Sequence, residues 1–367
     1  MPAGTVIESS APPGFDYGNA RVRAMWSRLL DRAAFDRMLG RGVDQVLEIL
    51  GSGEYAPDVR HALARARGTA AIHLAVSRNL ARTLHAVRGF YGGDAGSAVS
   101  LMLGRWDTAN VVTLLRAQVV EADAEDAAAM VVPAGAIDED VALEIARRPG
   151  LRAAAGLLVT WGLPDTQTAF AVLHAIPAYE STGDLSVLED EVVRAWAAGM
   201  DETLGRLRRG AEALTPLREE VDQRNALMSL RLLALARERG ADASSPRDRF
   251  LPGGLIDPGV FAAAASAASN RDAAAALAAP TAAAAWRPAL TRWAADGDLP
   301  RLQRELQVSL TLRTMSLLRR GDPLEAGVPL AYVFAKENEA RNLRIVAYGA
   351  ASGAPPAVVR DQVVAPW

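Results

Sequence analysis

The sequence predicts an all-α protein built from three similar helical modules in a pseudo-threefold or arc-like body. Three observations lead to this expectation. Good helix formers, above all Ala, Leu and Arg, dominate a chain of 367 residues. Apolar residues recur at helical spacing along most of the chain, whereas the alternation typical of strands is scarce. Related sequence elements also return at intervals of about 117 residues.

Helical periodicity is clear over 57–89, where Pro57 stands near the start and Gly89 provides a stop. Leu80 and Leu84 lie one turn apart on an apolar stripe of this segment. Segments rich in Gly and Pro separate this helix from its neighbours. The same kind of pattern predicts helices over 18–30, 98–120, 138–158, 165–176, 185–209, 214–239, 257–278, 299–320 and 330–349.

Composition excludes several classes of function. The net charge is −3 with both signs interspersed, and aromatic residues make up 5% of the chain, so the basic surface of a nucleic-acid binder is missing. The absence of cysteine excludes disulfides, thiolate metal sites and cysteine nucleophiles. No uninterrupted apolar run reaches the length of a membrane-spanning helix. Residues 1–14 lack a signal-peptide pattern and are expected to form a flexible tail.

An internal repeat organises the chain. The motif Pro-x-Gly-x-Ile-Asp begins at Pro133 and returns 119 residues later at Pro252, each time followed by a helix, a short break and another helix. A weaker version of this layout, without the Pro-Gly turn, covers 35–55. We therefore expect helical modules over 15–115, 116–228 and 229–367, the last of which includes the C-terminal helix.

A second repeated element places an acidic residue three positions before an asparagine. In a helix these two residues lie on adjacent turns of one face, where they can hydrogen-bond a loop. Because the element returns in each module, we interpret it as structural rather than catalytic. The four pairs are Asp16–Asn19, Asp107–Asn110, Asp222–Asn225 and Glu339–Asn342.

No catalytic, cofactor-binding or metal-binding residue is predicted. The single lysine, Lys336, is not preceded by glycines, so there is no phosphate-binding P-loop, and no Gly-x-Ser-x-Gly elbow occurs. His61, His73 and His85 are spaced by twelve, which points them in three directions on one helix. The acidic clusters at 121–126, 138–144 and 189–191 stand beside predicted helix starts and are interpreted as caps.

Several segments, in order, resemble the C subunit of the bacterial and archaeal V/A-type ATPases, whose eukaryotic counterpart is the d subunit. The resemblance covers about 15–365, with an Ala- and Arg-rich composition and an extension before Phe15 as departures. The segments are YGNARVRAMWSRLL (17–30), RWDTANVVTLLRA (105–117), Leu-Pro-Gly-Gly (251–254) and AYVFAKENEARNLRIVAYG (331–349).

This resemblance implies three similar helical domains in a funnel. It also implies a non-catalytic central-rotor subunit of a rotary ATPase or ATP synthase, a socket that couples the central shaft to the membrane rotor ring. Its partners would be the shaft subunits and the ring, at the cytoplasmic face of the membrane, with no nucleic acid, no cofactor and no membrane span of its own. Whether the parent complex makes or consumes ATP is left open.

Arg21, Arg23 and Arg28 are candidate interface residues, because arginine is favoured at interfaces, although a solvated helix face explains them as well. Two other hypotheses remain. The chain could be a free-standing helical-repeat adaptor that binds soluble partners. It could also be an enzyme with an unusual carboxylate site, if acids of 121–126 and 138–144 met in one pocket.

Overall fold

The computed structural model describes residues 14–207, 210–239 and 249–364. Within these ranges the chain is helical and contains no strand, which confirms the all-α prediction. The 3-10 helices Glu212–Leu214 and Thr281–Trp286 accompany the α-helices. The α-helices are α1 (Phe15–Trp26), α2 (Arg32–Met38), α3 (Val43–Gly51), α4 (Ala56–Leu63), α5 (Gly68–Arg88), α6 (Gly93–Val119), α7 (Ala124–Ala129), α8 (Glu139–Ala146), α9 (Leu151–Trp161), α10 (Thr166–Thr182), α11 (Ser186–Arg206), α12 (Thr215–Arg239), α13 (Pro258–Ala265), α14 (Asn270–Ala278), α15 (Arg287–Asp296), α16 (Leu299–Arg320), α17 (Gly327–Ser352) and α18 (Pro356–Gln362).

The helix predicted over 57–89 is in fact two helices, α4 and α5. Gly68, the first residue of α5, has a φ of +60°, a left-handed conformation that interrupts the helical path. Gly150, with a φ of +80°, separates α8 from α9 in the same way. Each Pro-x-Gly-x-Ile-Asp motif is followed by two helices, α8 and α9 after the first copy and α13 and α14 after the second. The predicted break is therefore confirmed, and the single helices predicted over 138–158 and 257–278 are each two helices.

The first helix begins and ends earlier than the predicted 18–30. It ends at Trp26, and the backbone N–H of Leu30 donates to Glu339 rather than to a carbonyl of the preceding turn. The predicted tail over 1–14 lies, apart from Gly14, outside the described residues. The weak helix-break-helix pattern at 35–55 corresponds to α2 and α3.

Aspartates begin several helices, as the acidic clusters at 121–126 and 138–144 indicated. Asp123 accepts hydrogen bonds from the backbone at the start of α7, and Asp138 accepts from Val141 N at the start of α8. Asp257 accepts from Gly259 N at the start of α13. Each carboxylate satisfies an N–H that the helix leaves unpaired and complements the positive end of its dipole. The interpretation of the cluster at 189–191 as a cap is wrong, because it lies within α11, makes no capping bond and pairs with arginines instead.

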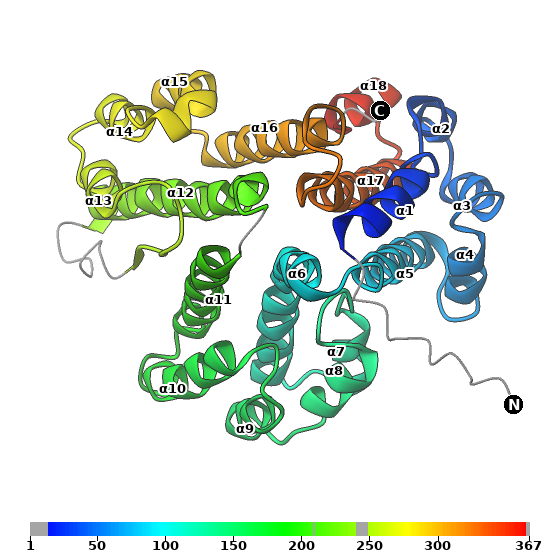
Figure 1. Ribbon diagram of the computed structural model, residues 1–367, viewed down its shortest axis with the longest axis horizontal. Coiled ribbons are helices and arrows are strands. Elements are labelled where there is room, and N and C mark those ends of the chain that lie inside the picture. Colours follow the sequence, from blue (N-terminus) through cyan, green and yellow to red (C-terminus); the bar gives the residue numbers. More distant parts are fainter. Residues whose placement is uncertain (1–13, 208–209, 240–248, 365–367) are drawn as a thin grey trace, which may run out of the picture.

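The short helices gather at three separate corners of the molecule. Figure 1 shows α14 and α15 at upper left, α8 and α9 toward the bottom, and α2 and α3 at upper right, with the long helices running between them. The first and the last helices that the structure describes lie together, because α17 packs against α1, α3, α5 and α18. Segments more than 300 residues apart in sequence therefore share one side of the body.

The buried hydrophobic residues form three main clusters. The first joins α1–α6 to α17 and includes Leu80, Met102 and Val333. The second lies among α6 and α8–α11, around Ile145 and Leu158. The third lies among α12–α16. The module boundaries stay a prediction, and the first cluster unites N-terminal helices with a helix of the last predicted module.

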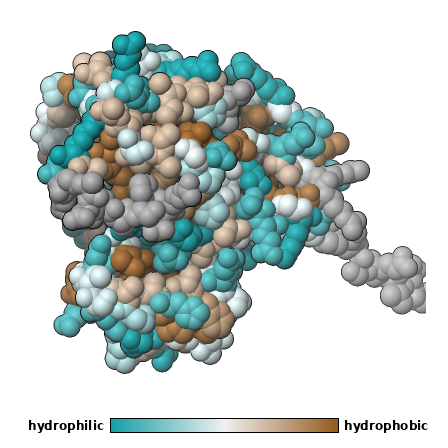
Figure 2. All heavy atoms as spheres, turned by 90° about the vertical axis from the view of Figure 1, so that its left-hand side faces the viewer, coloured by the Kyte–Doolittle hydropathy of each residue, from teal (hydrophilic) through white to brown (hydrophobic). Residues whose placement is uncertain are grey.

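The surface on the side that holds α12–α15 is mixed in hydropathy (Figure 2). Figure 2 shows hydrophobic residues scattered there among hydrophilic and pale ones. Among the helices of the described ranges, none combines the length and the apolarity needed to cross a membrane.

Candidate functional site

Helix α6 holds a distant loop through Asp107 and Asn110. The two carboxylate oxygens of Asp107 accept from Ala136 N and Ile137 N, each at 2.9 Å. One turn on, Asn110 binds both backbone groups of Val132, donating to its O at 2.8 Å and accepting from its N at 3.0 Å. We call this arrangement, an acid and an asparagine on one helix that together hold a loop, a clamp.

Helix α12 repeats the clamp. Asp222 accepts from Leu255 N and Ile256 N at 2.9 Å. Asn225 donates to Leu251 O at 2.9 Å and accepts from Leu251 N at 2.8 Å. The loops held by the two clamps contain the two copies of the Pro-x-Gly-x-Ile-Asp motif. The acid-x-x-Asn element and the Pro-x-Gly-x-Ile-Asp motif, which the sequence shows as separate repeats, therefore bind each other in the structure.

The glycine of that motif leaves room for the carboxylate. A Cβ built on Gly135 falls well inside 3.0 Å of the Asp107 carboxylate, and one built on Gly254 meets Asp222 in the same way. Real Cβ contacts are essentially never that short. The motif therefore requires glycine so that the backbone can approach the acid closely.

Helix α17 makes the third clamp with both ends of the chain. Glu339 Oε2 accepts from Leu30 N at 2.5 Å. Asn342 donates to Val364 O at 2.8 Å and accepts from Val364 N at 3.0 Å. A continuous loop fills the first two clamps, whereas an N-terminal and a C-terminal segment share the third.

In all three clamps the bound segment continues with an aspartate. The position after each bound N–H is an aspartate that caps the next helix: Asp31 after Leu30, Asp138 after Ile137 and Asp257 after Ile256. The segment that starts at Leu30 is thus bound to α17 in the same way that the loop after α6 is bound to α6 and the loop after α12 is bound to α12.

The remaining acid-x-x-Asn pair behaves differently. Asn19 donates to Pro323 O and Glu325 O at 2.8 and 3.0 Å and accepts from the Tyr91 hydroxyl at 2.8 Å. Asp16 is exposed in the first turn of α1 and does not share these contacts. This pair fastens α1 to the segment before α17 through its asparagine alone.

Burial changes the acidity of the clamp carboxyls. Removal from water raises the pKa of Asp222 to about 6, although the backbone N–H groups of Leu255 and Ile256 oppose this rise. The same cause raises the pKa of Asp107. Glu339 instead has a cation beside it: Lys336 Nζ lies 2.5 Å from its Oε1, and the Tyr55 hydroxyl donates to that oxygen at 2.7 Å.

Arg105 connects three long helices at one point. From α6 its guanidinium donates to Glu220 of α12 at 2.8 Å and to Glu337 of α17 at 2.7 Å. It also lies over the Phe334 ring, 4.7 Å from the centroid, and Trp106 Nε1 donates to Glu337 at 2.9 Å. The side chains of Arg105, Glu220 and Glu337 are only 11, 17 and 15% exposed. We call these three residues the central triad.

The triad occupies matching positions on the three clamp helices. Arg105, Glu220 and Glu337 each stand two residues before the clamp acid. Burial alone would raise the pKa of Glu220, but the charges of Arg105 and Arg224 leave it lowered. Glu220 is therefore an ionised partner of Arg105 at neutral pH.

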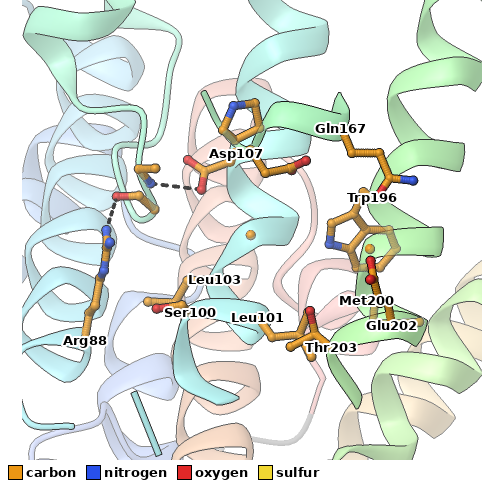
Figure 3. A pocket seen from close by; sticks show the side chains of 16 residues that line it. Arg88, Ser100, Leu101, Leu103, Asp107, Gln167, Trp196, Met200, Glu202 and Thr203 are labelled. Carbon is orange, nitrogen blue, oxygen red and sulfur yellow. Dashed lines mark hydrogen bonds between the residues drawn. The ribbon is translucent and has the colours of Figure 1, made fainter. Parts of the chain in front are cut away.

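A cavity of about 340 Å³ opens beside the first clamp, between α5 and α6 on one side and α10 and α11 on the other. Figure 3 shows Arg88 and Asp107 on its clamp side and Gln167, Trp196 and Glu202 opposite. Arg88 donates to Gly135 O at 2.8 Å and so supports the clamped loop. Trp196 Nε1 is buried and has no hydrogen-bond partner within the described residues.

The predicted interface arginines do not share one face. Arg21 and Arg28 line a second cavity of about 580 Å³ between α1, α5 and α17. Arg23 lies outside it and donates to Leu318 O at 3.5 Å. The structure thus brings Arg21 and Arg28 together and separates Arg23 from them.

Acids of the two clusters meet at a third cavity, of about 430 Å³. Glu125, Glu139 and Asp140 line it together with His61. All three carboxylates are on exposed residues, and burial and neighbouring arginines lower the pKa of His61. In the part of the chain that the structure covers, no group of three or more His, Cys, Asp or Glu is placed to hold a metal ion.

Reasoning from sequence missed the central triad. Its signal was present, because Arg105, Glu220 and Glu337 are separated by 115 and 117 residues, as are the asparagines of the clamps. The change from arginine to glutamate hid the correspondence. The sequence also carried no sign of the contact between Lys336 and Glu339.

Comparison with known proteins gives consistent matches. The family described as ATP synthase (C/AC39) subunit matches this chain over residues 18–362. The C subunit of the V-type ATP synthase of Deinococcus radiodurans is 32% identical over 252 residues, which is 67% of this chain and 66% of that protein. The C subunit of the A-type ATP synthase of Methanosarcina barkeri is 24% identical over 95% of this chain and 92% of its own length. The corresponding protein of Haloferax volcanii is 26% identical, with coverage of 95 and 97%.

Proposed function

The chain belongs to the ATP synthase (C/AC39) subunit family, and from this we propose that it is a non-catalytic central-rotor subunit that joins a shaft to a membrane ring. Its place is peripheral, at the cytoplasmic face of the membrane, within a V/A-type rotary complex. Shaft subunits bind one side of the body and the polar loops of the rotor ring bind another. Torque passes through the protein between these two partners.

The central triad is the observation that carries this proposal. A part that transmits torque must resist deformation between its two contacts. Arg105 makes two short charge-assisted hydrogen bonds to acids on different helices, and such contacts fix geometry as well as position. The three clamps add bonds between each long helix and a segment distant in sequence. Together they stiffen the centre and the periphery of the same body.

The repeated contacts also favour three similar modules around a pseudo-threefold axis. The triad positions lie at matching places on α6, α12 and α17, and the short helices form three corners (Figure 1). In this arrangement the modules follow the boundaries 15–115, 116–228 and 229–367. The third module is completed by the N-terminal segment that Glu339 binds. The body is then a closed funnel with the triad near its axis.

Affinity capture from native membranes tests the function. The tagged full-length chain is purified in a mild detergent, and its partners are identified by mass spectrometry. We expect headpiece, shaft and ring subunits in one assembly. Recovery of soluble proteins alone would reject the rotor role and favour the helical-repeat adaptor. The matched control is the same tag on an unrelated helical protein expressed at the same level.

A further inference from the structure

The 580 Å³ cavity between α1, α5 and α17 has the features of a site for an anionic group. Arg21 and Arg28 lie seven residues apart on and just after α1, so that both face the cavity from one side of that segment. Tyr17, Phe90 and Tyr332 contribute aromatic walls. The cavity therefore combines cationic side chains with apolar surface.

Arg21 and Arg28 have no carboxylate partner among the described residues. Arg21 is held in place without one: its guanidinium lies 4.6 Å from the Phe90 ring centroid, and its Nη1 donates to the Tyr17 hydroxyl at 3.2 Å. Arg28 forms no ion pair with any residue that the structure describes. Both guanidiniums keep most of their donors available for a ligand.

The other charges of the cavity leave a positive surplus. Arg82 pairs with the buried Asp58 at 2.8 Å, and Lys336 pairs with Glu339. Glu54 is the one carboxylate in the wall, within the described part of the chain, and it shares the cavity with two unpaired arginines. An anionic ligand would thus find two cations that are not already neutralised.

Asn79 adds an unsatisfied acceptor to the cavity wall. The residue is 2% exposed, and its Nδ2 donates to Asp58 Oδ2 at 2.8 Å. Its Oδ1 is buried without a hydrogen-bond partner in the described ranges. A buried acceptor left unpaired costs free energy.

We propose that this cavity binds an acidic segment of a partner protein. Arg21 and Arg28 each take a carboxylate, which the planar guanidinium can bind through two parallel hydrogen bonds. A protein segment supplies carboxylates, N–H donors and side chains for the aromatic walls, whereas inorganic phosphate supplies only the anion. That the partner is a subunit of a rotary complex rests on the proposed function.

Photochemical cross-linking from inside the cavity tests this site. A photoreactive benzoylphenylalanine replaces Ala24, an exposed residue of the cavity wall, in the full-length tagged chain within its native membranes. Adducts are digested and sequenced by mass spectrometry. We expect a cross-linked segment with two or more acidic residues within two helical turns.

Paired variants decide the role of the arginines. In Arg21→Gln/Arg28→Gln, the yield of this adduct should fall about tenfold, the effect of losing two exposed ion pairs. Arg23→Gln on the same helix is the matched control and should leave the yield unchanged. The melting temperature of the double variant should lie within about 4 °C of that of the wild type, and this result would show that the variant folds.

Each other outcome has a defined meaning. A segment without acidic residues, a lipid adduct, no adduct, or equal yields in the two variants would overturn the acidic-segment site. An acidic segment from a protein that is not a rotary-complex subunit would leave the site intact and reject the proposed function instead.

Discussion

Arg105 on α6 and Glu337 on α17 form an ion pair of 2.7 Å, although they stand 232 positions apart in the chain. Each stands two residues before the clamp acid of its helix. Because Glu220 completes the contact from α12, one guanidinium holds three helices together. The stability of the whole body should therefore be sensitive to this single side chain.

Replacement of Arg105 by methionine should lower the free energy of unfolding by about 3 kcal/mol. The change keeps an extended side chain but leaves Glu220 and Glu337 largely buried without their cation. Denaturation with urea measures the loss. Arg116→Met is the control, because it breaks an ion pair with Glu189 whose arginine is 61% exposed, and it should cost less than about 1 kcal/mol. Equal losses would show that the triad is no stronger than a surface pair.

Gly135→Ala and Gly254→Ala should each destabilise the protein by about 2–4 kcal/mol. In both variants the new methyl group collides with a clamp carboxylate, so the loop or the acid must move and hydrogen bonds to buried groups are lost. Gly156→Ala is the control: it lies inside α9 with open space around it and should stabilise the helix by about 0.5–1 kcal/mol. A neutral result at Gly135 and Gly254 would contradict the clamp geometry.

Asp222 should make stability depend on pH in the mildly acidic range. Its pKa is about 6 in the folded protein against an ordinary value of 3.8, so the folded state holds the proton more tightly. Stability from this group is therefore complete at low pH and is lost as the pH rises through 6. Between about pH 4 and 7, wild type should lose up to about 3 kcal/mol relative to Asp222→Asn.

The measurement is a series of urea denaturation curves at several pH values for wild type and Asp222→Asn. Asp16→Asn, at the exposed acid of the remaining pair, is the control and should follow wild type. Parallel curves for wild type and Asp222→Asn would refute the assignment of this pH dependence to Asp222.

Asn342→Ala should release the C-terminal segment while leaving the rest of the fold in place. The variant removes both hydrogen bonds from Asn342 to Val364. It leaves Val364 N without a partner, whereas Val364 O keeps the bond from Asn338 Nδ2 at 3.2 Å, and the cost is about 1–3 kcal/mol. Hydrogen exchange should rise in α18 and at Val364 but not in α9. Asn110→Ala is the comparison and should raise exchange at Val132 instead. Exchange that rises evenly over the whole chain would indicate general unfolding rather than loss of one clamp.

Much of the fold could be predicted because its signals are local. Helical periodicity indicated most of the long helices, and the regular spacing of Asp107, Asp222 and Glu339 indicated the repeat. Breaks at Gly68 and within the α8–α9 segment were harder to place, because a left-handed glycine is visible only in the backbone.

The contacts that join the modules could not be predicted in the same way. Arg105 and its two acids differ in residue type, so similarity does not connect them. Leu30 carries no side-chain signal for its bond to Glu339, since the backbone N–H makes that bond. Both contacts depend on which helices meet in space, and that information is not contained in any single segment.

The split third clamp sets the order in which the protein can be completed during synthesis. Leu30 leaves the ribosome early, but its partner Glu339 emerges more than 300 residues later, and Val364 follows after that. The cores around α8–α11 and α12–α16 are contiguous in sequence and can close while translation continues. The N-terminal helices must wait for α17, which supplies part of their core. The closure of this clamp is therefore a slow, long-range step that takes place only once Val364 has been made.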